Sequence, residues 1–367
     1  MSKKYSTVIC VLYCVLVLSL SALLFFLPKE DFSPKENRIL AKMPRLSAEN
    51  LIDGRFSEDF SLFCADRFPF RASMLTLNSS FELALGKLEA RGVMRGTDKS
   101  LIKRLEYNNY ERLKENLFAI EEIREYAQSK GKKAVFFCAP RAVDVLGGYC
   151  HPLFDTQKSK EIWGHVKDAE TITEALRHKA EQGEYVFYKT DHHWTTLGAY
   201  YTYVKLGKLL GYSPYPLSDF TFETVSNDFY GTTYSSCLLP DVSPDKITAF
   251  RYEGDEEISV TDTSTQKVSG LYDFSALDTS SKYDFFLGGN RAHLKIESGK
   301  PRLTVIKDSF ANSLLPFLAR HYDIDVIDPR YLREPLEEFL DEIFSDEERS
   351  DVLILFGVDT LMGNAGL

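Results

Sequence analysis

The chain has 367 residues, which is enough for one large domain or two domains of ordinary size. Hydrophobic residues make up 44% of the chain and charged residues 27%, a balance typical of a globular protein with a substantial core. The formal net charge of −10 argues against a nucleic-acid ligand, because phosphate binding requires a basic surface.

The N-terminal segment is apolar enough to cross a membrane. Residues 8–27 carry no charge and are long enough to span a bilayer as a helix. Lys3 and Lys4 precede them, and this positive flank orients the N-terminus toward the cytoplasm and the rest of the chain outside. Residues 19–21 resemble a small-x-small cleavage site, but cleavage there would leave the apolar residues 23–27 exposed. We therefore expect an uncleaved anchor rather than a signal peptide.

Three parts are predicted along the chain. They are a membrane anchor at residues 1–27, a polar, proline-containing juxtamembrane linker at 28–50, and an extracytoplasmic domain at 51–367. Within that domain, residues 213–283 are turn-rich, polar and aromatic, and are predicted to form an insertion that shapes a substrate cleft.

Four cysteines, Cys64, Cys138, Cys150 and Cys237, lie outside the predicted membrane segment. No C-x-x-C pair occurs, which argues against a thiolate zinc site. A domain of this size does not depend on disulfides, so a bond between Cys138 and Cys150 is left open.

From residue 106 onward, helical and strand patterns alternate. Apolar residues at helical spacing predict helices, and short apolar runs predict buried strands. Helices are expected at 106–130, 158–182, 197–210 and 310–320, and strands at 133–139, 185–188, 303–307, 325–327 and 351–356. Strands separated by helices imply an α/β fold with a parallel sheet flanked by helices on both faces.

The densest chemistry lies in four consecutive residues, Asp191, His192, His193 and Trp194, in a chain with only seven histidines and two tryptophans. The block follows a predicted strand and precedes Thr195, a candidate N-cap for the next helix. In an extended backbone, Asp191 and His193 would share one face and His192 would take the other. A carboxylate beside an imidazole fixes its tautomer and stabilises the imidazolium, as a general base requires.

A group for this base to activate is expected at Ser309. It follows the predicted strand 303–307 at the start of a predicted helix, where backbone N–H groups can stabilise an oxyanion. Taken alone, Ser309 fits a helix N-cap better than a nucleophile. Together with Asp191 and His193, it makes a Ser-His-Asp triad the leading hypothesis. All three residues are predicted to follow the carboxyl end of a strand, where α/β sheets bind ligands.

The residues of this block could also serve in metal binding or in packing. Asp191, His192 and His193 could bind zinc, but three adjacent ligands on one loop suit tetrahedral coordination poorly. His192 could bond backbone carbonyls, and Trp194 could pack in the core rather than stack on a sugar. No H-E-x-x-H spacing occurs, so neither a metal nor another cofactor is predicted.

Several motifs resemble a known family. The block at 191–194 is similar to the signature of bacterial DHHW proteins, which resemble the alginate O-acetyltransferase group of SGNH-hydrolase-like proteins outside the cytoplasmic membrane. The further matches run from about residue 36 to about residue 331 and include 36–41 with Pro44, 66–71, 229–232 and 307–313. The resemblance implies an SGNH-hydrolase-like sheet for the α/β domain.

The resemblance also implies roles for individual residues. Ser309 would be the nucleophile, His193 the base and Asp191 its orienting carboxylate. Gly289 and Asn290 would belong to the block that supplies oxyanion donors. Here that block precedes the serine, Arg291 stands where an aspartate often follows, and Lys307 replaces the glycine of the usual Gly-Asp-Ser. Arg330 and Tyr331 resemble a block that would contact an acyl or sugar group, and Trp194 is a further substrate-binding candidate.

The function implied is extracytoplasmic O-acetyl transfer to a cell-surface or secreted polysaccharide through an acyl-enzyme, with a membrane-bound O-acyltransferase as the partner that supplies the acyl group. Two alternatives are left open. One is a carbohydrate acetyl esterase with the same triad, and the other is a non-catalytic scaffold that binds glycan.

Overall fold

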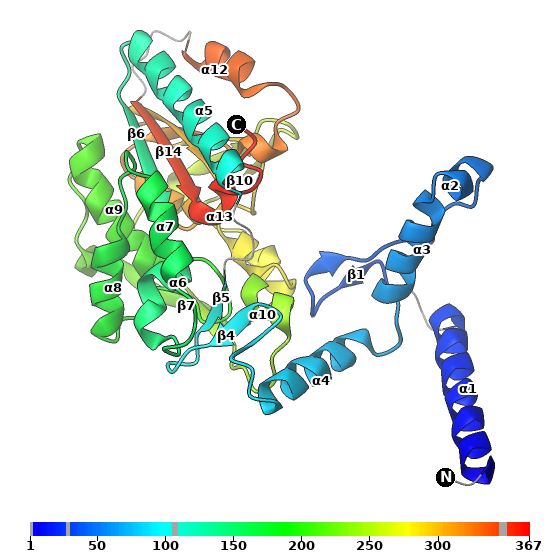
Figure 1. Cartoon of the computed structure of the whole chain (residues 1–367). Helices are drawn as coiled ribbons and strands as arrows, with labels where there is room; N and C mark the ends of the chain where they lie inside the picture. Colours follow the sequence, from blue (N-terminus) through cyan, green and yellow to red (C-terminus); the bar gives the residue numbers. More distant parts are fainter. Residues whose placement is uncertain (1–2, 27–29, 105–108, 345–350) are drawn as a thin grey trace. The chain divides into compact units, whose positions relative to one another are not determined.

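The computed structural model describes residues 3–26, 30–104, 109–344 and 351–367 (Figure 1). The chain forms two compact units. The first comprises Met1–Lys87 and Ser235–Pro240, and the second comprises Leu88–Tyr234 and Asp241–Leu367. The predicted boundary at 50/51 therefore lies inside the first unit.

The first unit begins with helix α1 (Lys3–Phe26), whose segment Tyr5–Phe26 is long and apolar enough to cross a membrane and has no buried residue in its most apolar window. This agrees with the predicted N-terminal apolar helix, as a membrane anchor or a signal segment. The short strands β1 (Phe32–Ser33) and β2 (Arg38–Ile39) pair antiparallel, and three helices follow: α2 (Ala48–Ile52), α3 (Arg55–Asp66) and α4 (Arg71–Ala84).

Ion pairs connect the two family-like motifs of this unit. Arg38 donates to both carboxylate oxygens of Asp66, at 2.8 and 2.5 Å, and the Ala41 amide adds a third bond at 2.9 Å. The hydrogen bond from Arg38 lowers the pKa of Asp66 to about 2. Arg71 pairs with Glu36 at 2.8 Å. The two motifs at 36–41 and 66–71 are therefore joined in one structure.

The second unit is built on a seven-stranded sheet in the order β10-β9-β11-β13-β12-β14-β6. Its strands are β6 (Ala134–Ala139), β9 (Ser259–Asp262), β10 (Lys267–Ser269), β11 (His293–Glu297), β12 (Arg302–Lys307), β13 (Asp323–Ile327) and β14 (Asp351–Gly357). Strands β13, β12, β14 and β6 run parallel, whereas β11, β9 and β10 pair antiparallel.

The predicted α/β class is confirmed, but the sheet is mixed rather than all-parallel. Strands β9 and β11 alternate buried and exposed residues, a pattern suited to an antiparallel edge, and β9 and β10 come from the segment that was predicted to be an insertion. The parallel strands β6, β12 and β14 are nearly continuous buried runs, which is why the sequence revealed them.

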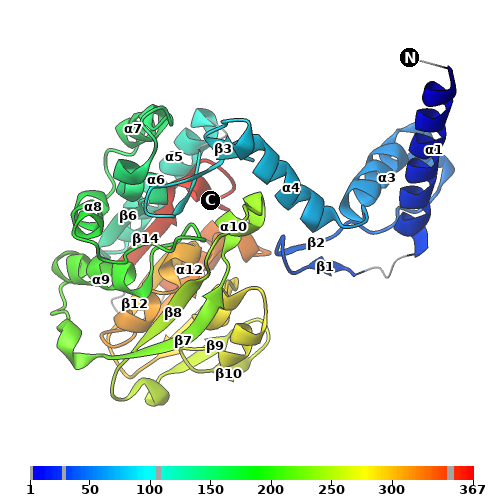
Figure 2. The same cartoon turned by 90° about the horizontal axis from the view of Figure 1, so that it is seen from below.

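Smaller elements surround the sheet. Strands β3 (Glu89–Ala90), β4 (Val93–Arg95) and β5 (Leu101–Lys103) form a three-stranded sheet, and β7 (Thr221–Phe229) pairs with β8 (Asp245–Arg251), as Figure 2 shows. The helices are α5 (Tyr110–Ser129), α6 (Ala142–Leu146), α7 (Gln157–His165), α8 (Thr173–Glu181), α9 (Thr196–Leu210), α10 (Thr232–Cys237), α11 (Leu315–Leu318), α12 (Leu336–Phe344) and α13 (Val358–Leu361). Short 3-10 turns lie at Gly147–Tyr149, Leu217–Asp219, Asp255–Glu257, Phe274–Asp278, Lys282–Phe285, Ser309–Ala311 and Pro329–Tyr331.

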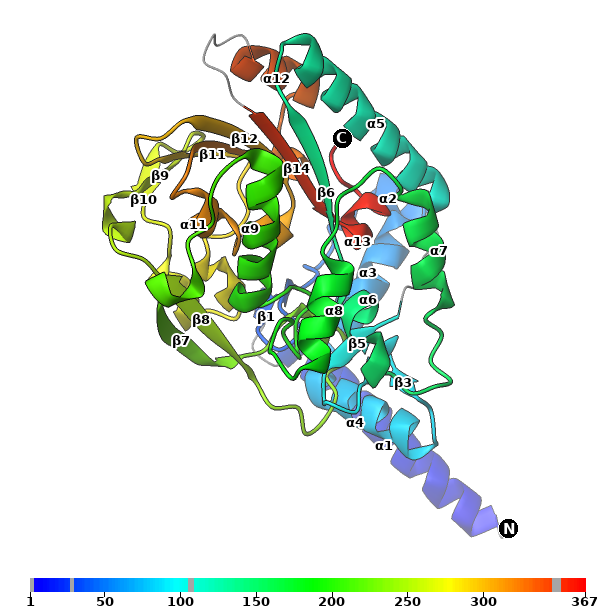
Figure 3. The same ribbon diagram turned by 90° about the vertical axis from the view of Figure 1, so that its left-hand side faces the viewer.

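The core has two layers, one on each face of the sheet. Successive residues of β6, such as Phe136 and Phe137, point to opposite faces of the sheet and belong to different hydrophobic clusters. Helices α6, α8 and α9 cover one face, whereas α5, α12 and α13 cover the other. Figure 3 shows α9 and α5 on opposite sides of β6 and β14. The predicted helices on both faces are therefore present.

Three predicted elements were wrong in detail. The single helix expected at 158–182 is two helices, α7 and α8, because Glu170 between them pairs with the edge of β6, with N···O distances of 2.8 and 2.9 Å. The helix expected at 310–320 is reduced to the 3-10 turn at Ser309–Ala311 and the short α11. The run 185–188 is buried at its last three residues but joins no sheet, and Phe187 makes only an isolated bridge to Trp194.

Candidate active site

The turn that carries Ser309 is clamped by the residue before it. Asp308 separates Ser309 from the end of β12, is fully buried, and accepts the Phe310 amide at 2.9 Å. The other carboxylate oxygen of Asp308 accepts the Gly357 amide at 2.7 Å and the Thr360 hydroxyl at 2.6 Å, which ties the turn to the end of β14 and to α13. Asp308 is thus the N-cap, and the Ser309 hydroxyl is left for another partner.

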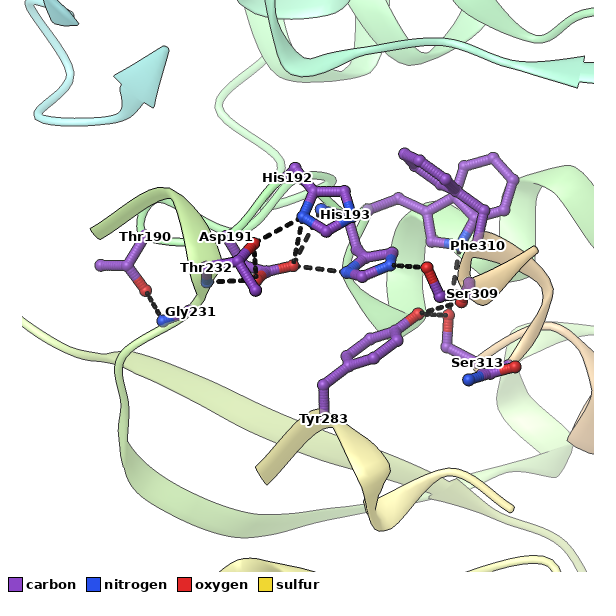
Figure 4. A network of polar contacts seen from close by, with 12 residues as sticks. Thr190, Asp191, His192, His193, Gly231, Thr232, Tyr283, Ser309, Phe310 and Ser313 are labelled. Atoms are coloured by element: carbon purple, nitrogen blue, oxygen red, sulfur yellow. Dashed lines mark hydrogen bonds and ion pairs between the residues drawn. The ribbon is translucent and has the colours of Figure 1, made fainter. Parts of the chain in front are cut away.

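Ser309, His193 and Asp191 form one hydrogen-bonded line (Figure 4). The His193 Nε2 lies 2.8 Å from the Ser309 Oγ, and the His193 Nδ1 lies 2.5 Å from the Asp191 Oδ1. Asp191 is 1% exposed and His193 is 4% exposed. In this geometry a neutral imidazole can accept the serine proton while the carboxylate holds its other nitrogen.

The charge on Asp191 is strongly stabilised. Burial alone would raise its pKa, but the imidazoles of His193 and His192 and hydrogen bonds to the carboxylate hold that pKa well below its usual range. Besides His193, the donors are the Thr232 amide at 2.8 Å and the Thr232 hydroxyl at 3.0 Å. A permanent carboxylate is what an imidazolium partner requires.

Hydrogen bonds from another segment, rather than a strand end, hold the loop that carries Asp191. The Thr190 hydroxyl accepts the Gly231 amide at 3.0 Å, and Asp245 accepts the amide and hydroxyl of Thr190 at 2.7 and 2.5 Å. The expectation that Asp191 and His193 follow a strand of the main sheet was therefore wrong, whereas Ser309 does follow one.

Gly231 explains why a glycine lies in the motif at 229–232. A Cβ atom at this position would lie 2.2 Å from the Asp191 Cβ and 2.4 Å from its Oδ2, closer than real Cβ atoms come. The bare backbone of Gly231 thus makes room for the buried carboxylate.

Backbone alternation predicted that His192 would point away from His193, but the two side chains lie against each other. The two rings lie 3.8 Å apart between centroids, and the His192 Nδ1 lies 2.6 Å from the Thr232 Oγ1. The surrounding protein and the facing His193 lower the pKa of His192 to about 4, although 40% of its side chain is exposed. His192 is therefore neutral at neutral pH and packs against the other imidazole.

Tyr283 is a site residue that sequence reasoning missed. Its ring stacks on His193 with centroids 4.0 Å apart and planes 9° apart. Its hydroxyl donates to the Ser313 Oγ at 3.1 Å and lies 3.3 Å from the Ser309 carbonyl oxygen. Burial raises the pKa of Tyr283, so the phenol stays neutral. It lies in a 3-10 turn of the turn-rich segment, where no local pattern marks it.

A buried lysine lies directly under the serine turn. Lys307 is 1% exposed, and its Nζ donates to Asn290 at 2.9 Å, to Asn312 at 2.8 Å and to Asp328 at 3.3 Å. Burial lowers the pKa of Lys307, and Asp328 opposes that effect. All three ammonium protons therefore have acceptors.

This network orients Asn290. Its side-chain oxygen accepts from Lys307 and also from the Asn312 Nδ2 at 3.1 Å. Because both bonds reach the oxygen, they determine which end of the amide faces the network and leave the Nδ2 protons for another acceptor. Asn312 belongs to the serine turn, since its amide donates to the Ser309 carbonyl at 3.2 Å.

The other predicted substrate-binding residues have different surroundings. Gly289 donates its amide to the Phe286 carbonyl at 3.1 Å, so it is not available as an oxyanion donor. Trp194 is 0% exposed and its indole donates to the Ser313 Oγ at 3.2 Å, which makes it a core residue rather than a sugar platform. Arg330 is held by Asp328 through bonds of 2.8 and 2.7 Å. Its guanidinium therefore lies at the edge of the lysine network.

The zinc alternative can be weighed against the same distances. Ligand atoms of Asp191, His192 and His193 lie within 4.8 Å of one another. Both ring nitrogens of His193, however, already face the Asp191 and Ser309 oxygens at hydrogen-bond distance. The geometry favours the triad assignment for these residues.

Comparison with known proteins supports the family resemblance. Residues 167–327 match the model of the DHHW protein family, and residues 93–238 match an SGNH hydrolase-like domain described as acetyltransferase AlgX. The predicted resemblance to DHHW proteins is confirmed. The match to an acetyltransferase domain supports an acyltransferase-type enzyme. No curated protein sequence matches the chain.

Solved structures share the fold. A DHHW family protein from Eubacterium siraeum is 22% identical with a TM-score of 0.59, covering 76% of this chain and 94% of that one. Bacillus cereus PatB1, solved with a sulfonyl adduct, is 19% identical with a TM-score of 0.61, covering 75% of this chain and 97% of that one.

The close fit of Gly231 against Asp191 generates a prediction. Gly231→Ala should displace the carboxylate and lower the rate of Ser309 labelling by a fluorophosphonate roughly 100-fold, the effect expected of a displacement of about 1 Å. Gly270→Ala is the matched control, because a Cβ there meets nothing within 4 Å. Equal labelling of both variants would show that the contact between Gly231 and Asp191 does not position the site.

Proposed function

We propose that this protein is an extracytoplasmic O-acetyltransferase that modifies a cell-surface or secreted polysaccharide through a Ser309-His193-Asp191 triad. The observation that carries the proposal is the hydrogen-bonded line from the Asp191 carboxylate through His193 to the Ser309 Oγ. The match to an acetyltransferase domain over residues 93–238 supports acetyl transfer among the reactions that such a triad performs.

In the first half-reaction, the Ser309 Oγ attacks the carbonyl carbon of an acetyl donor and its proton passes to the His193 Nε2. Collapse of the tetrahedral intermediate breaks the bond to the leaving group, which takes that proton from His193. In the second half-reaction a sugar hydroxyl loses its proton to His193 and attacks the acetyl-serine. The acetyl ester leaves on the sugar, and the Ser309 Oγ regains the proton.

Two features would stabilise charge during these steps. The flat contact with Tyr283 places an electron-rich ring face against His193 when it becomes an imidazolium. The half-exposed Asn290 would donate its Nδ2 protons to the oxyanion, since Lys307 and Asn312 occupy its oxygen.

The acetyl donor must reach the site from outside the membrane. Acetyl-CoA is a charged cytoplasmic compound, and the described residues contain one helix that could cross a bilayer. One helix cannot form a path for an acyl group. With the chain anchored by α1 and its second unit outside, a multi-spanning membrane-bound O-acyltransferase would supply the acetyl group.

The triad assignment predicts large losses of turnover of a small activated acetyl ester. Ser309→Ala and His193→Ala should each lower kcat roughly 10⁴- to 10⁶-fold, Asp191→Asn should lower it roughly 10⁴-fold, and combined variants should lose little more. His192→Ala should be much milder, because His193 and not His192 accepts the Ser309 proton. His178→Ala on the exposed surface of α8 is the control.

Full turnover by Ser309→Ala would end the proposal of a serine nucleophile. Supplying a polysaccharide and following both polymer-bound and released acetate then separates transfer from hydrolysis. Release of free acetate alone would identify an esterase with the same triad.

The buried network predicts that Lys307 acts through Asn290. Lys307→Met should lower kcat roughly 10- to 100-fold with little change in KM, because the amide loses its orientation toward the transition state. Asn290→Ala should have at least that effect, and the double variant should match Asn290→Ala alone. Additive losses in this cycle would mean that Lys307 supports the turn without orienting Asn290.

The need for a partner predicts a difference between cells and purified protein. Deleting the membrane-bound O-acyltransferase should abolish polymer-bound acetate in cells, whereas the purified chain still cleaves small acetyl esters. Polymer acetylation that continues without the partner and still requires Ser309 would show that the donor arrives by another route.

A further inference from the structure

The first unit carries an unusual concentration of exposed apolar side chains. Outside α1, thirteen exposed large hydrophobic residues lie within the 58 residues from 30 to 87, against nine in the described residues of the much longer segment 88–367. Scattered exposed apolar residues are normal on a soluble surface, but a gathered patch marks an interaction site.

Helix α4 organises part of this surface into a stripe. Phe70, Met74, Leu77, Phe81 and Leu85 are separated by three or four positions, so they follow one face of the helix and the residues that flank it. Their exposed fractions are 64, 46, 64, 61 and 66%, respectively. We call these five residues the α4 stripe.

Helix α4 carries apolar side chains on its outer face, where a helix that packs on a core would be polar. Leu75 and Leu83 are half-buried and lie one turn before and one turn after Ser79 on the inner face. The buried residue of α4 is polar: Ser79 is 0% exposed and donates to the Cys237 carbonyl at 2.7 Å. Thr76 and Ser80 turn their hydroxyls back onto backbone carbonyls of the same helix. A helix that presents phenylalanine and leucine outward has an apolar face directed at another phase or molecule.

The position of the stripe in the chain indicates what that phase is. It begins 44 residues after Phe26, the last residue of an apolar helix whose own surface is unburied in the protein. Phenylalanine and leucine on one face of a helix are the residues that enter the interfacial region of a bilayer.

Electrostatic attraction does not draw this segment to a membrane surface. Residues 28–87 contain nine lysines and arginines and nine aspartates and glutamates, so the segment is formally neutral. Burial of apolar area must therefore provide the binding energy, without a requirement for anionic lipid.

We infer that the α4 stripe lies in the interfacial layer of the membrane that α1 enters, and so holds this unit flat against the lipid. The inference concerns how the protein is attached to the membrane and not the reaction that it catalyses. It rests on one part of the proposed function, the anchoring of the chain by α1. A second contact beside α1 would limit how far the chain can extend from the bilayer.

A pair of tryptophan variants tests the inference in the full chain, reconstituted in phosphatidylcholine vesicles with or without brominated acyl chains. Phe81→Trp places the probe in the stripe. Phe118→Trp on α5 is the matched control, because Phe118 is 66% exposed and belongs to the second unit. The native Trp163 and Trp194 give the same background in both variants.

In brominated vesicles, we expect the added emission of Phe81→Trp to fall roughly two-fold or more, and that of Phe118→Trp to stay unchanged. The quenching should persist at about 1 M salt, where the Debye length is about 3 Å, because no charge attraction is involved.

Two outcomes would overturn the inference. Blue-shifted emission of Phe81→Trp without bromine quenching would mean that protein covers the stripe, either the second unit or another copy of the chain. Emission typical of water-exposed indole would mean that nothing covers it. Turnover of a small acetyl ester in the same vesicles reports on Ser309 separately, so a failed inference and a failed functional proposal can be distinguished.

Discussion

The candidate site depends on one buried charge, the Asp191 carboxylate. A carboxylate that is 1% exposed is costly unless hydrogen bonds and opposite charge compensate it. Here the compensation comes from His193 and from the amide and hydroxyl of Thr232. Because Thr232 lies about forty residues further along the chain, the charge can be buried at low cost only when the two segments are docked. The hydrogen bonds that the buried Asp191 carboxylate needs thus hold the loop at 190–193 against the segment that contains Thr232.

The turn that carries Ser309 also contains a buried carboxylate that needs hydrogen-bond donors. Asp308 is fully buried and accepts hydrogen bonds from its own turn, from Gly357 at the end of β14 and from Thr360 in α13. Lys307, one residue earlier, points its ammonium into a cage of Asn290, Asn312 and Asp328. The rigid sheet therefore positions the nucleophile, while a docked loop brings the base to it. An arrangement of this kind keeps the proton-transfer distance short without depending on one continuous element.

Sequence patterns predicted the parts of this structure that obey local rules. Strand β12 is a buried apolar run, and Ser309 follows it as expected. Thr195 caps α9, and Gly211 ends it with a positive φ of 86°. The run 185–188 has the same apolar character as a strand, but it is buried by side-chain packing and not by sheet pairing, which periodicity cannot distinguish.

The contacts that the sequence could not reveal are all between distant segments. Tyr283 reaches His193 from a 3-10 turn, and Gly231 is required by a side chain forty positions earlier. The contact between the His192 and His193 rings contradicts backbone alternation because the loop is not an extended strand. The burial of the Ser79 hydroxyl in α4 also depends on a distant residue, Cys237, whose carbonyl accepts its hydrogen bond. Such contacts depend on tertiary structure, and one sequence carries no periodic signal for them.

The central claim is that Ser309 carries the acetyl group during the reaction. The most direct measurement is mass spectrometry of peptides after brief mixing of the purified chain with an activated acetyl ester and acid quenching. One acetyl group on the peptide that contains Ser309, absent in Ser309→Ala and removed when a polysaccharide acceptor is added, is the predicted result. Turnover of the ester with no acetyl group on that peptide at any mixing time, and undiminished in Ser309→Ala, would contradict the account.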